Sequence, residues 1–515
     1  MEAETTTPTP KPVHIVIFPL PLQGHVIPAV HLAIKLASKG FIITFVNTQL
    51  IHHQITKSLN QNDIDDVVVD IFAGAREAGL DIRYRTVSDG FPLSFDRVLN
   101  REQYILEGPL GVHMPAPMEE LMGDLVKSAD PSVSVFIADT FFSWQSSIAK
   151  KYDLVSVSFW TEPALVFSLY YHLDLLKING HFGGASHNKD IIDYIPGVKA
   201  IKPNDLPSNL QELDVSTIMH EFIKNAFEGV KRADMILCNT VYELEFETIL
   251  AIQENQPMYA IGPLFPSRFN SSLVPTSIKP ESDCMEWLNS KLPNSVLYIS
   301  FGSFVPCGKK EIDEIAHGLM LSKVNFLWVL RPDVMSYVKP YALPIGFEDE
   351  TKDRGLIVTW TNQIKVISHY AIGGFLTHCG WNSVLESLWH GVPMLCFPLM
   401  TDQLTNRKLL VDDWRTGMNL CDEKSLTRFE VVDKINSLMC RKSITVLKEN
   451  ATKVKDIMKN GLVLDGSSEK NLSRFITDLK IKIANDQSNK SHACLFLNNL
   501  RPKERPSTAI ISVQR

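Results

Sequence analysis

Apolar runs of five or six residues recur along the chain and alternate with amphipathic segments. Near the start, residues 13–18 predict a strand, residues 27–39 carry apolar side chains at helical spacing, and residues 42–46 predict a second strand. The loop PLPLQGH lies between the first strand and the helix. This strand–helix–strand order indicates a Rossmann-like opening, but the first turn lacks the glycines of GxGxxG, so no dinucleotide cofactor is expected on this half.

The same alternation of predicted strands and helices continues along the rest of the chain. Residues 133–138, 154–159 and 235–239 predict further strands, and the aromatic segment 160–185 predicts a pocket wall. Residues 285–290 and 310–322 predict helices, and residues 295–300, 326–331 and 356–359 predict strands. We therefore expect an α/β fold with two Rossmann-like domains that face one another across a cleft. A chain of 515 residues is also too long for one hydrophobic core.

The stretch from Trp360 to Gln403 combines this pattern with many polar residues. Residues 373–377 predict a strand, a tight turn follows, and Asn382 and Ser383 predict the start of a helix that ends at Gly391. No Lys or Arg lies between residues 365 and 407. An anion bound here must therefore be held by backbone N–H groups with Ser383 and His378, as suits the diphosphate of a sugar nucleotide.

This stretch closely resembles the signature box of plant secondary-product UDP-glycosyltransferases, from its opening Trp to its closing Asp-Gln. The resemblance covers residues 13–480 and implies the GT-B fold, with UDP-glucose as a co-substrate. It implies that Trp360 stacks on uracil, that Gln363 and the backbone of Thr361 and Asn362 contact uracil and ribose, and that Glu386 binds the ribose hydroxyls. The predicted donor site comprises Ser303, Trp360, Thr361, Asn362, Gln363, His378, Cys379, Gly380, Trp381, Asn382, Ser383, Glu386, Met400, Thr401, Asp402, Gln403 and Thr161.

Within that set, the resemblance implies that His378, Asn382 and Ser383 bind the diphosphate. It implies that Trp381, Asp402 and Gln403 hydrogen-bond to the sugar hydroxyls, and Gln403 is typical of glucose-preferring members. Thr161 resembles a sugar-contacting threonine, and Ser303 resembles a residue that reaches the phosphates. Thr361-Asn362 departs from the family, which has a small residue or Cys followed by Pro, and we expect a looser loop without a lost contact.

His25 is the candidate general base. It follows the first strand, and an imidazole titrates near neutral pH. Asp139 ends another strand of the same predicted sheet, where a carboxylate can orient the imidazole. The family uses such a His–Asp pair, and PLQGH and Asp139-Thr140-Phe141 match its two motifs. Without the resemblance, His25 is better interpreted as a packing or capping residue, and Asp139 as a helix N-cap. His31, His52 and His53 are expected at the surface.

Composition limits the other functions. The net charge of −7 without a long basic run argues against nucleic-acid binding. Eight scattered cysteines without paired spacing indicate a reduced, cytoplasmic protein. No signal peptide or membrane span is predicted. A DxD at Asp63–Asp65 suggests metal binding, but a polar loop is the favoured interpretation, and no metal is expected. We expect a monomer that acts on a small apolar acceptor in plant secondary metabolism, with an acceptor pocket formed near residues 110–120, 142–144 and 160–172.

Domain limits follow from composition. We expect a disordered N-terminus at 1–12, an acceptor domain at 13–255, a linker at 256–282, a donor domain at 283–465, a helix crossing back at 466–480 and a disordered tail at 481–515. The expected chemistry is one inverting displacement. The alternatives are an oxidoreductase, which NAD(P)H fluorescence would detect, and a sugar-nucleotide binding protein, which the presence of both His25 and Asp139 argues against.

Overall fold

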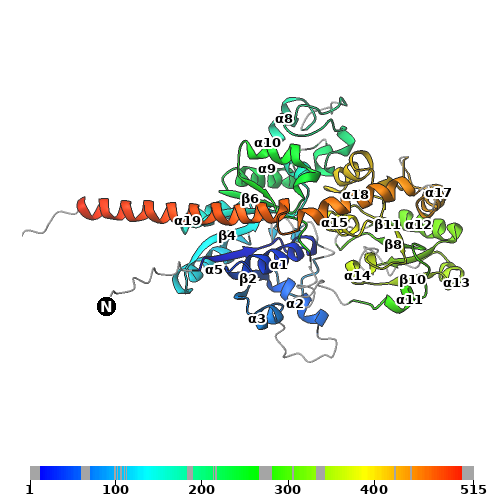
Figure 1. Ribbon diagram of the computed structural model, residues 1–515, viewed down its shortest axis with the longest axis horizontal. Coiled ribbons are helices and arrows are strands. Elements are labelled where there is room, and N and C mark those ends of the chain that lie inside the picture. Colours follow the sequence, from blue (N-terminus) through cyan, green and yellow to red (C-terminus); the bar gives the residue numbers. More distant parts are fainter. Residues whose placement is uncertain are drawn as a thin grey trace, which may run out of the picture. The chain divides into compact units, whose positions relative to one another are not determined.

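The computed structural model describes most of the chain (Figure 1). The described residues are 12–59, 70–97, 100, 103–104, 107–108, 111, 113–182, 189–212, 214, 217–265, 281–303, 307–331, 343–422, 425–440 and 444–500. The expected disordered N-terminus up to residue 11, the DxD at Asp63–Asp65, and residues 266–280 of the predicted linker lie outside them, as do residues 501–515.

The N-terminal half forms a parallel sheet of seven strands in the order β3-β2-β1-β4-β5-β6-β7. The strands are β1 (His14–Phe18), β2 (Ile42–Thr48), β3 (Ile82–Val87), β4 (Val133–Asp139), β5 (Val155–Trp160), β6 (Met235–Cys238) and β7 (Met258–Ala260). The helices between them are α1 (Gln23–Ala37), α2 (Gln49–Leu59), α3 (Ala73–Glu77), α5 (Pro115–Ser128), α6 (Gln145–Lys151), α7 (Ala164–Tyr171), α8 (Leu173–Ile178), α9 (Ile218–Val230) and α10 (Phe246–Gln253), with short 3₁₀ turns η1 (Pro203–Asp205), η2 (Ser208–Gln211) and η3 (Tyr242–Leu244).

The C-terminal half forms a second parallel sheet in the order β10-β9-β8-β11-β12-β13. Its strands are β8 (Val296–Ser300), β9 (Asn325–Val329), β10 (Gly355–Val358), β11 (Ile372–Thr377), β12 (Met394–Cys396) and β13 (Gly417–Asn419). Its helices are α11 (Met285–Asn289), α12 (Lys309–Ser322), α13 (Phe347–Thr351), α14 (Gln363–Ile367), α15 (Trp381–His390), α16 (Gln403–Lys408), which continues as a π turn η5 (Leu409–Asp413), α17 (Arg428–Met439), α18 (Thr445–Gly461) and α19 (Ser467–Leu500).

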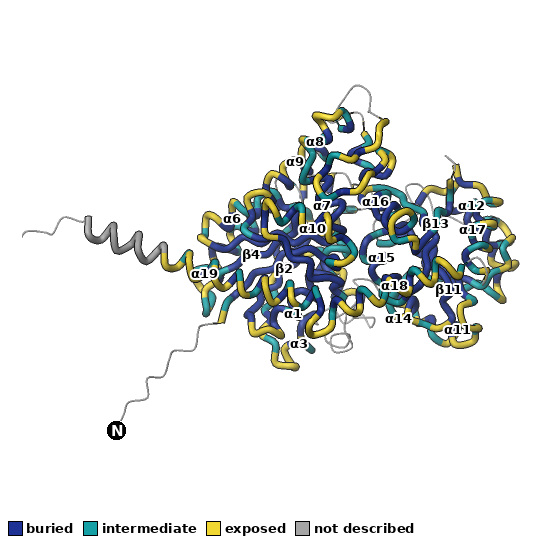
Figure 2. The backbone as a smooth tube through the Cα atoms, turned by 45° about the horizontal axis from the view of Figure 1, so that its top comes forward, coloured by how far each residue is buried: buried dark blue, intermediate teal, exposed yellow. Residues whose placement is uncertain are grey.

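Both sheets confirm the predicted fold class of two Rossmann-like domains. The central strands are buried on both faces, as the dark blue tubes of Figure 2 show, and β1, β4 and β8 accordingly consist almost entirely of apolar residues. Both sheets belong to one compact unit that ends at Leu472. Among the helices of the described part of the chain, none has the length and apolarity needed to span a membrane.

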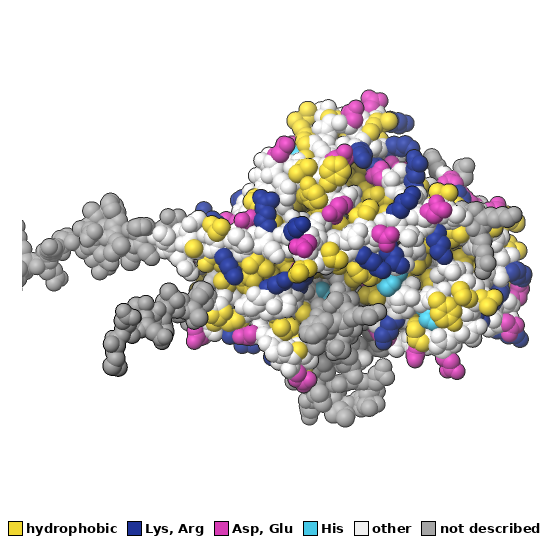
Figure 3. Space-filling view, viewed as in Figure 1, with side chains coloured by type: hydrophobic (Ala, Val, Ile, Leu, Met, Phe, Trp, Pro, Cys, Tyr) yellow, Lys and Arg dark blue, Asp and Glu magenta, His cyan; other side chains and the backbone are white. Residues whose placement is uncertain are grey.

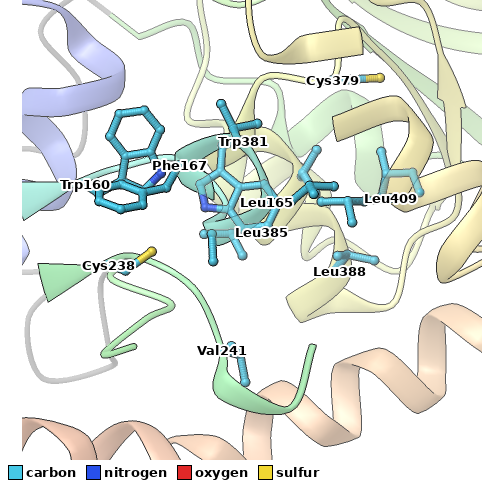
Figure 4. Packing of buried hydrophobic residues seen from close by; sticks show 14 of the residues in the cluster. Trp160, Leu165, Phe167, Cys238, Val241, Cys379, Trp381, Leu385, Leu388 and Leu409 are labelled. Carbon is cyan, nitrogen blue, oxygen red and sulfur yellow. The ribbon is translucent and has the colours of Figure 1, made fainter. Parts of the chain in front are cut away.

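One hydrophobic cluster joins the two sheets. It contains Trp160 and Phe167 from the N-terminal half, and Trp381, Leu385 and Leu388 from α15 (Figure 4). The Trp381 indole N–H also donates to the Asn239 carbonyl at 2.8 Å. This packing fixes the start of α15 against the carboxyl ends of the first sheet.

Two predictions near the N-terminus are wrong. His25 lies in the first turn of α1 and not in a loop, because the helix begins at Gln23. His31 is buried with 2% exposure, since it follows the buried face of α1, and burial lowers its pKa to about 4. His52 is partly buried beside Tyr84, and only His53 is exposed.

The predicted domain limits also differ from the structure. β7 pairs with β6, so the first sheet extends to Ala260 and the predicted linker begins too early. The Ser468 hydroxyl donates to the Gly262 carbonyl, and the Asn471 amide donates to the Ala260 carbonyl at 3.0 Å. Residues 481–500, predicted as a disordered tail, are helical. The sequence contains no Pro or Gly between Gly466 and Pro502, so nothing in the backbone interrupts the helix.

The surface carries charges of both signs. On the face shown in Figure 3, basic and acidic side chains of the described residues are interspersed. This distribution differs from the continuous basic surface that is typical of nucleic-acid binding.

Candidate functional site

A cavity of about 570 Å³ lies between the carboxyl ends of the two sheets. It is lined by residues of both halves, which is where parallel α/β sheets bind ligands. Of the predicted site residues, the following line it: His25, Thr161, Ser303, Trp360, Thr361, Asn362, Gln363, His378, Gly380, Trp381, Asn382, Ser383, Glu386, Met400, Thr401, Asp402 and Gln403. Asp139 and Cys379 do not line it.

His25 and Asp139 form a hydrogen-bonded pair on the N-terminal wall. His25 Nδ1 lies 2.7 Å from Asp139 Oδ2, and the carboxyl group is buried. The backbone N–H of Phe141 donates to Asp139 Oδ1 at 3.1 Å, so the end of β4 holds the carboxylate in place. A carboxylate only accepts hydrogen bonds, which places the ring proton on Nδ1 and leaves Nε2 as the nitrogen that can take a proton.

Thr161 completes this group. Its hydroxyl oxygen lies 2.9 Å from His25 Nδ1, because β5 lies beside β4 in the sheet. The resemblance implies a sugar contact for Thr161. In the structure its hydroxyl is a second hydrogen-bond partner of the imidazole ring, beside Asp139.

A proline in α1 connects the two walls. Pro28 lies inside the helix and has no N–H, so the Gly24 carbonyl, four residues earlier, does not receive the usual helical hydrogen bond. That carbonyl instead accepts from Asn382 Nδ2 at 2.8 Å. Asn382, a predicted diphosphate ligand, therefore also ties the start of α15 to the turn of α1 that carries His25.

The signature helix starts one residue earlier than predicted. α15 begins at Trp381 with Gly380 as its N-cap, and no side chain caps it. Asn382 and Ser383 thus lie within the first turn, where the backbone N–H groups have no helical acceptor. Their side chains are directed to other contacts, and the free N–H groups at the helix start are suited to an anion.

Cys379 is the one residue of the donor-site prediction whose side chain lies elsewhere. It is fully buried at a positive φ of 65°, and its carbonyl accepts from Asn406 at 2.9 Å. Burial raises the pKa of its thiol, first through loss of hydration and then through the neighbouring Cys396. The tight turn directs the thiol to β12, so Cys379 shapes the turn and does not line the cavity.

His378 lies between two glycines. A Cβ on Gly302 or on Gly380 would overlap the His378 ring at Nε2, so both positions require the absence of a side chain. Burial lowers the pKa of His378 to about 4, and the charge of Arg331 lowers it further. The ring is therefore neutral at pH 7 and contributes dipoles, not charge, to an anion.

Arg331 is a cation that the sequence analysis missed. It is buried just after β9, and its guanidinium donates to the Ser303 carbonyl. The absence of Lys and Arg between residues 365 and 407 suggested a site without a cation, but the sheet places Arg331 behind His378 from a different strand. Only the strand order, with β8 between β9 and β11, brings these residues together.

Gln363 links three polar residues of the donor wall. Its amide nitrogen donates to Ser383 Oγ at 2.8 Å and to Glu386 Oε2 at 2.7 Å, and its carbonyl oxygen accepts from the Tyr298 hydroxyl at 3.1 Å. Burial raises the pKa of Glu386 to about 7, although the hydrogen bond from Gln363 opposes this shift. The side chains of Gln363 and Glu386, which are predicted to contact uracil and ribose, are thus hydrogen-bonded to one another.

The loop Thr361-Asn362 is well anchored, contrary to expectation. Asn362 caps α14 by accepting from the Lys365 N–H at 3.1 Å, and the Thr361 hydroxyl donates to the Ser282 carbonyl at 3.2 Å. Side-chain hydrogen bonds therefore supply the restraint that a proline gives in the family.

The predicted sugar-contacting residues have several contacts already. The Trp381 indole N–H is bonded to Asn239, so only its backbone is left for a sugar. Asp402 accepts from Asn406 at 2.6 Å and from Thr401 at 2.9 Å, and burial raises its pKa. The Gln403 carbonyl oxygen accepts from the Leu399 and Met400 N–H groups, which leaves its amide N–H groups for a ligand among the contacts that the structure describes.

The acceptor wall was predicted poorly. Residues 110–120 and 142–144 were expected to line it, but none of their described residues does. Only segment 160–172 contributes as expected, through Thr161, Glu162 and Tyr170. Many of the missed residues come from 208–223, where no chemical motif marked them: Ser208, Asn209, Glu212, Thr217, Met219, Phe222 and Ile223. Tyr104 and Phe141 also line the cavity and were not predicted.

Known proteins share this arrangement. The chain matches the family described as UDP-glucoronosyl and UDP-glucosyl transferase over residues 230–463. UDP-glycosyltransferase 86A1 of Arabidopsis thaliana is 54% identical over 475 residues, which cover 91% of this chain and 95% of that protein. A 7-deoxyloganetin glucosyltransferase of Catharanthus roseus is 35% identical over 490 residues, covering 91% and 97%.

Solved structures agree with these relatives. A UDP-glucose: anthocyanidin 3-O-glucosyltransferase in complex with UDP gives a TM-score of 0.74 at 25% identity, covering 91% of this chain and 98% of that one. Phytolacca americana UGT2 with UDP-2fluoro-glucose and pterostilbene gives 0.72 at 26%, covering 91% and 100%. The signature stretch lies at the carboxyl edge of the second sheet, and the relatives cover nearly the whole chain. This chain therefore belongs to the plant UDP-glycosyltransferases.

Proposed function

We propose that this UDP-glycosyltransferase moves glucose from UDP-glucose to a hydroxyl or carboxyl group of a small, largely apolar acceptor, with inversion at the anomeric carbon. The observation that carries the proposal is the 2.7 Å contact between His25 and Asp139 on one wall of the cavity, with the start of α15 on the other. The base and the diphosphate site then lie on opposite sides of the space where the sugar would sit.

His25 acts as the general base in this mechanism. Its Nε2 takes the proton of the acceptor hydroxyl while the acceptor oxygen attacks the anomeric carbon and UDP departs. Asp139 keeps the proton on Nδ1 and stabilises the imidazolium that forms. A direct displacement needs no carboxylate nucleophile, so Asp139 stays behind the ring.

The departing diphosphate is stabilised by dipoles. The free N–H groups at the start of α15 point to an anion, Ser383 adds a hydroxyl, and the Arg331 charge lies behind the neutral His378 ring. These groups support transfer without a metal ion, which remains a prediction. Addition of a chelator at millimolar concentration is expected to leave the rate unchanged.

Gln403 and several relatives support glucose as the sugar. Two of the curated relatives carry glucosyltransferase in their names, and the free amide N–H groups of Gln403 line the cavity. The apolar residues of the acceptor wall favour apolar small molecules. Cytoplasmic location and a monomeric state are likewise predictions.

The test combines a donor and acceptor panel with a base variant. UDP-glucose, UDP-galactose and UDP-glucuronate are each incubated with a set of phenols, terpenoid alcohols and carboxylic acids, and products are read by mass spectrometry. We expect glucoside formation in the wild type and a loss of about 100- to 10,000-fold in His25→Ala. His53→Ala, on the exposed face of α2, is the matched control. Full activity in His25→Ala would contradict the base assignment.

A further inference from the structure

Three polar side chains interrupt the apolar acceptor wall. Glu162, Tyr170 and Asn209 line the cavity from the end of β5, from α7 and from η2. We call them the polar patch. Asn209 was not predicted, Glu162 and Tyr170 were expected only as part of the pocket segment 160–172, and the mechanism above uses none of the three.

Glu162 is the residue next to Thr161, whose hydroxyl contacts His25. Its carboxyl group accepts no hydrogen bond from the residues that the structure describes, and the residue is half-buried at the cavity wall. Burial raises its pKa well above the usual range, and the nearby carboxylates of Asp402 and Asp139 raise it further. Partial burial of a carboxyl group that no protein group satisfies is unfavourable, and a ligand in the cavity can supply the missing hydrogen bond.

Asn209 presents the second unsatisfied group. Its side-chain carbonyl accepts from the Tyr170 hydroxyl at 2.8 Å, and its backbone carbonyl receives His220 Nε2 at 2.5 Å, so the residue is held firmly. It is only 7% exposed, and its amide nitrogen has no partner among the described residues. The amide nitrogen is a donor, whereas the Glu162 carboxyl oxygens are acceptors.

Tyr170 connects the two. The charge of Glu162 is the second cause, after burial, that raises the pKa of the Tyr170 phenol, and the charge of Asp402 is the third. The polar patch therefore lies near Asp402, which lines the same cavity from the C-terminal half.

We propose that the polar patch binds a hydroxyl group of a substrate, which donates to Glu162 and accepts from Asn209. A hydroxyl suits both residues, because it is a donor and an acceptor at once. The proposal rests on the proposed function and refines its acceptor class. The hydroxyl comes either from the transferred sugar or from a second oxygen of the acceptor, in addition to the one that reacts.

The experiment uses Glu162→Ala, with Glu162→Gln as the conservative variant. Glu120→Gln, at an exposed carboxylate on α5 that does not line the cavity, serves as the control for the loss of one carboxylate. Calorimetric titration with UDP and with UDP-glucose measures the sugar arm. Transfer to the best acceptor of the panel, and to the same acceptor with its second hydroxyl O-methylated, measures the acceptor arm.

If the bound hydroxyl belongs to the sugar, Glu162→Ala should raise the Kd of UDP-glucose about tenfold or more and leave the Kd of UDP unchanged. If the bound hydroxyl belongs to the acceptor, Glu162→Ala should raise the KM of the unmethylated acceptor about tenfold and leave the KM of the O-methylated acceptor unchanged. In either case Glu162→Gln recovers most of the loss, because a neutral amide still bonds a hydroxyl.

Unchanged constants in both arms for a folded Glu162→Ala, checked by its melting temperature, would overturn the proposal and leave the proposed function intact. A wild type that binds neither UDP nor UDP-glucose, or transfers to no acceptor, would instead remove the proposed function and this inference with it. A purely structural role of Glu162 predicts equal losses for UDP and UDP-glucose and for both acceptors, which also contradicts the proposal.

Discussion

The two walls of the cavity satisfy their polar groups in different ways. On the donor wall, Gln363 joins Tyr298, Ser383 and Glu386 in one hydrogen-bonded network. On the acceptor wall, His25, Asp139 and Thr161 form one tight group, whereas the Glu162 carboxyl group and the Asn209 amide nitrogen have no partner among the described residues. The Gln363 network is therefore held by its own hydrogen bonds, whereas the Glu162 carboxyl group and the Asn209 amide nitrogen are left for a ligand to satisfy.

Removal of the Asp139 charge is expected to have the largest effect on the acceptor wall. Asp139→Asn replaces an obligate acceptor with an amide that can donate, so the His25 proton can move to Nε2 and the base is lost. We expect kcat to fall about 100-fold or more while the Kd of UDP-glucose stays unchanged.

Steady-state kinetics and calorimetry measure these two quantities. Asp124→Asn, an exposed carboxylate on α5 of the same half, controls for the loss of one negative charge. If the Kd of UDP-glucose rose in parallel with the loss of kcat, the two walls would not be separable in the way that their hydrogen bonds indicate.

The donor wall should be most sensitive to the glycines around His378. Gly302 has a φ of +75°, and a Cβ there would overlap the ring, whereas Gly40 has a φ of +87° with nothing within 4 Å. Both Gly302→Ala and Gly40→Ala should lose about 1–2 kcal/mol of unfolding free energy from the backbone alone.

Only Gly302→Ala should also weaken UDP binding, by about tenfold, because the displaced ring disturbs the diphosphate site. Chemical denaturation and UDP titration separate the two effects. Equal UDP affinity in both variants would show that the His378 ring tolerates the added methyl group.

Acidification should weaken the donor wall through Glu386. Its pKa is raised to about 7 by burial, so the carboxyl group loses its proton as the pH rises through 7. The ionised form accepts ribose hydroxyls better, so the affinity for UDP-glucose should fall as the pH drops from 8 to 6, by up to about tenfold.

UDP-glucose is the appropriate probe, since its diphosphate is esterified at both ends and does not titrate in this range. His378, with a pKa of about 4, stays neutral throughout. Glu386→Gln should make the affinity independent of pH between 6 and 8. A pH dependence that survives in this variant would assign the titration to another group.

The donor wall was predictable because most of it is one stretch of chain. Residues from Trp360 to Gln403 keep a fixed spacing, and the strand–turn–helix pattern of residues 373–390 follows from local apolar periodicity. Cys379 was misplaced because its positive φ, which sequence does not reveal, turns the side chain away. Arg331 was missed because it joins the site through sheet order and not through sequence proximity.

The acceptor wall was less predictable because it is assembled from distant segments. His25 and Asp139 were found through their motifs and their places after parallel strands. Segment 208–223 has no chemical motif, and its residues from η2 and the start of α9 reach the cavity through tertiary packing. The Ser208 hydroxyl, for example, accepts from the Thr401 N–H at 2.8 Å across the cleft. Such contacts depend on how the two sheets pack, which local patterns do not encode.

The smallest expected effect concerns the contact between the walls. Pro28→Ala restores a backbone N–H that can donate to the Gly24 carbonyl and compete with Asn382. A carbonyl accepts two hydrogen bonds, so the competition is partial, and we expect kcat/KM to fall about two- to fivefold. Pro115→Ala is the matched control, since Pro115 is the first residue of α5, where an added N–H has no helical acceptor.

Stability should move in the opposite direction. A proline inside a helix removes a hydrogen bond, so Pro28→Ala should raise the melting temperature while it lowers activity. In an Asn382→Ala background the contact is already lost, and adding Pro28→Ala should then change kcat/KM little, which a double-mutant cycle measures. If the proline substitution lowers activity equally in both backgrounds, the loss arises from a shift of His25 within α1. The link between the walls would then lie in the packing of Trp381 and not in this hydrogen bond.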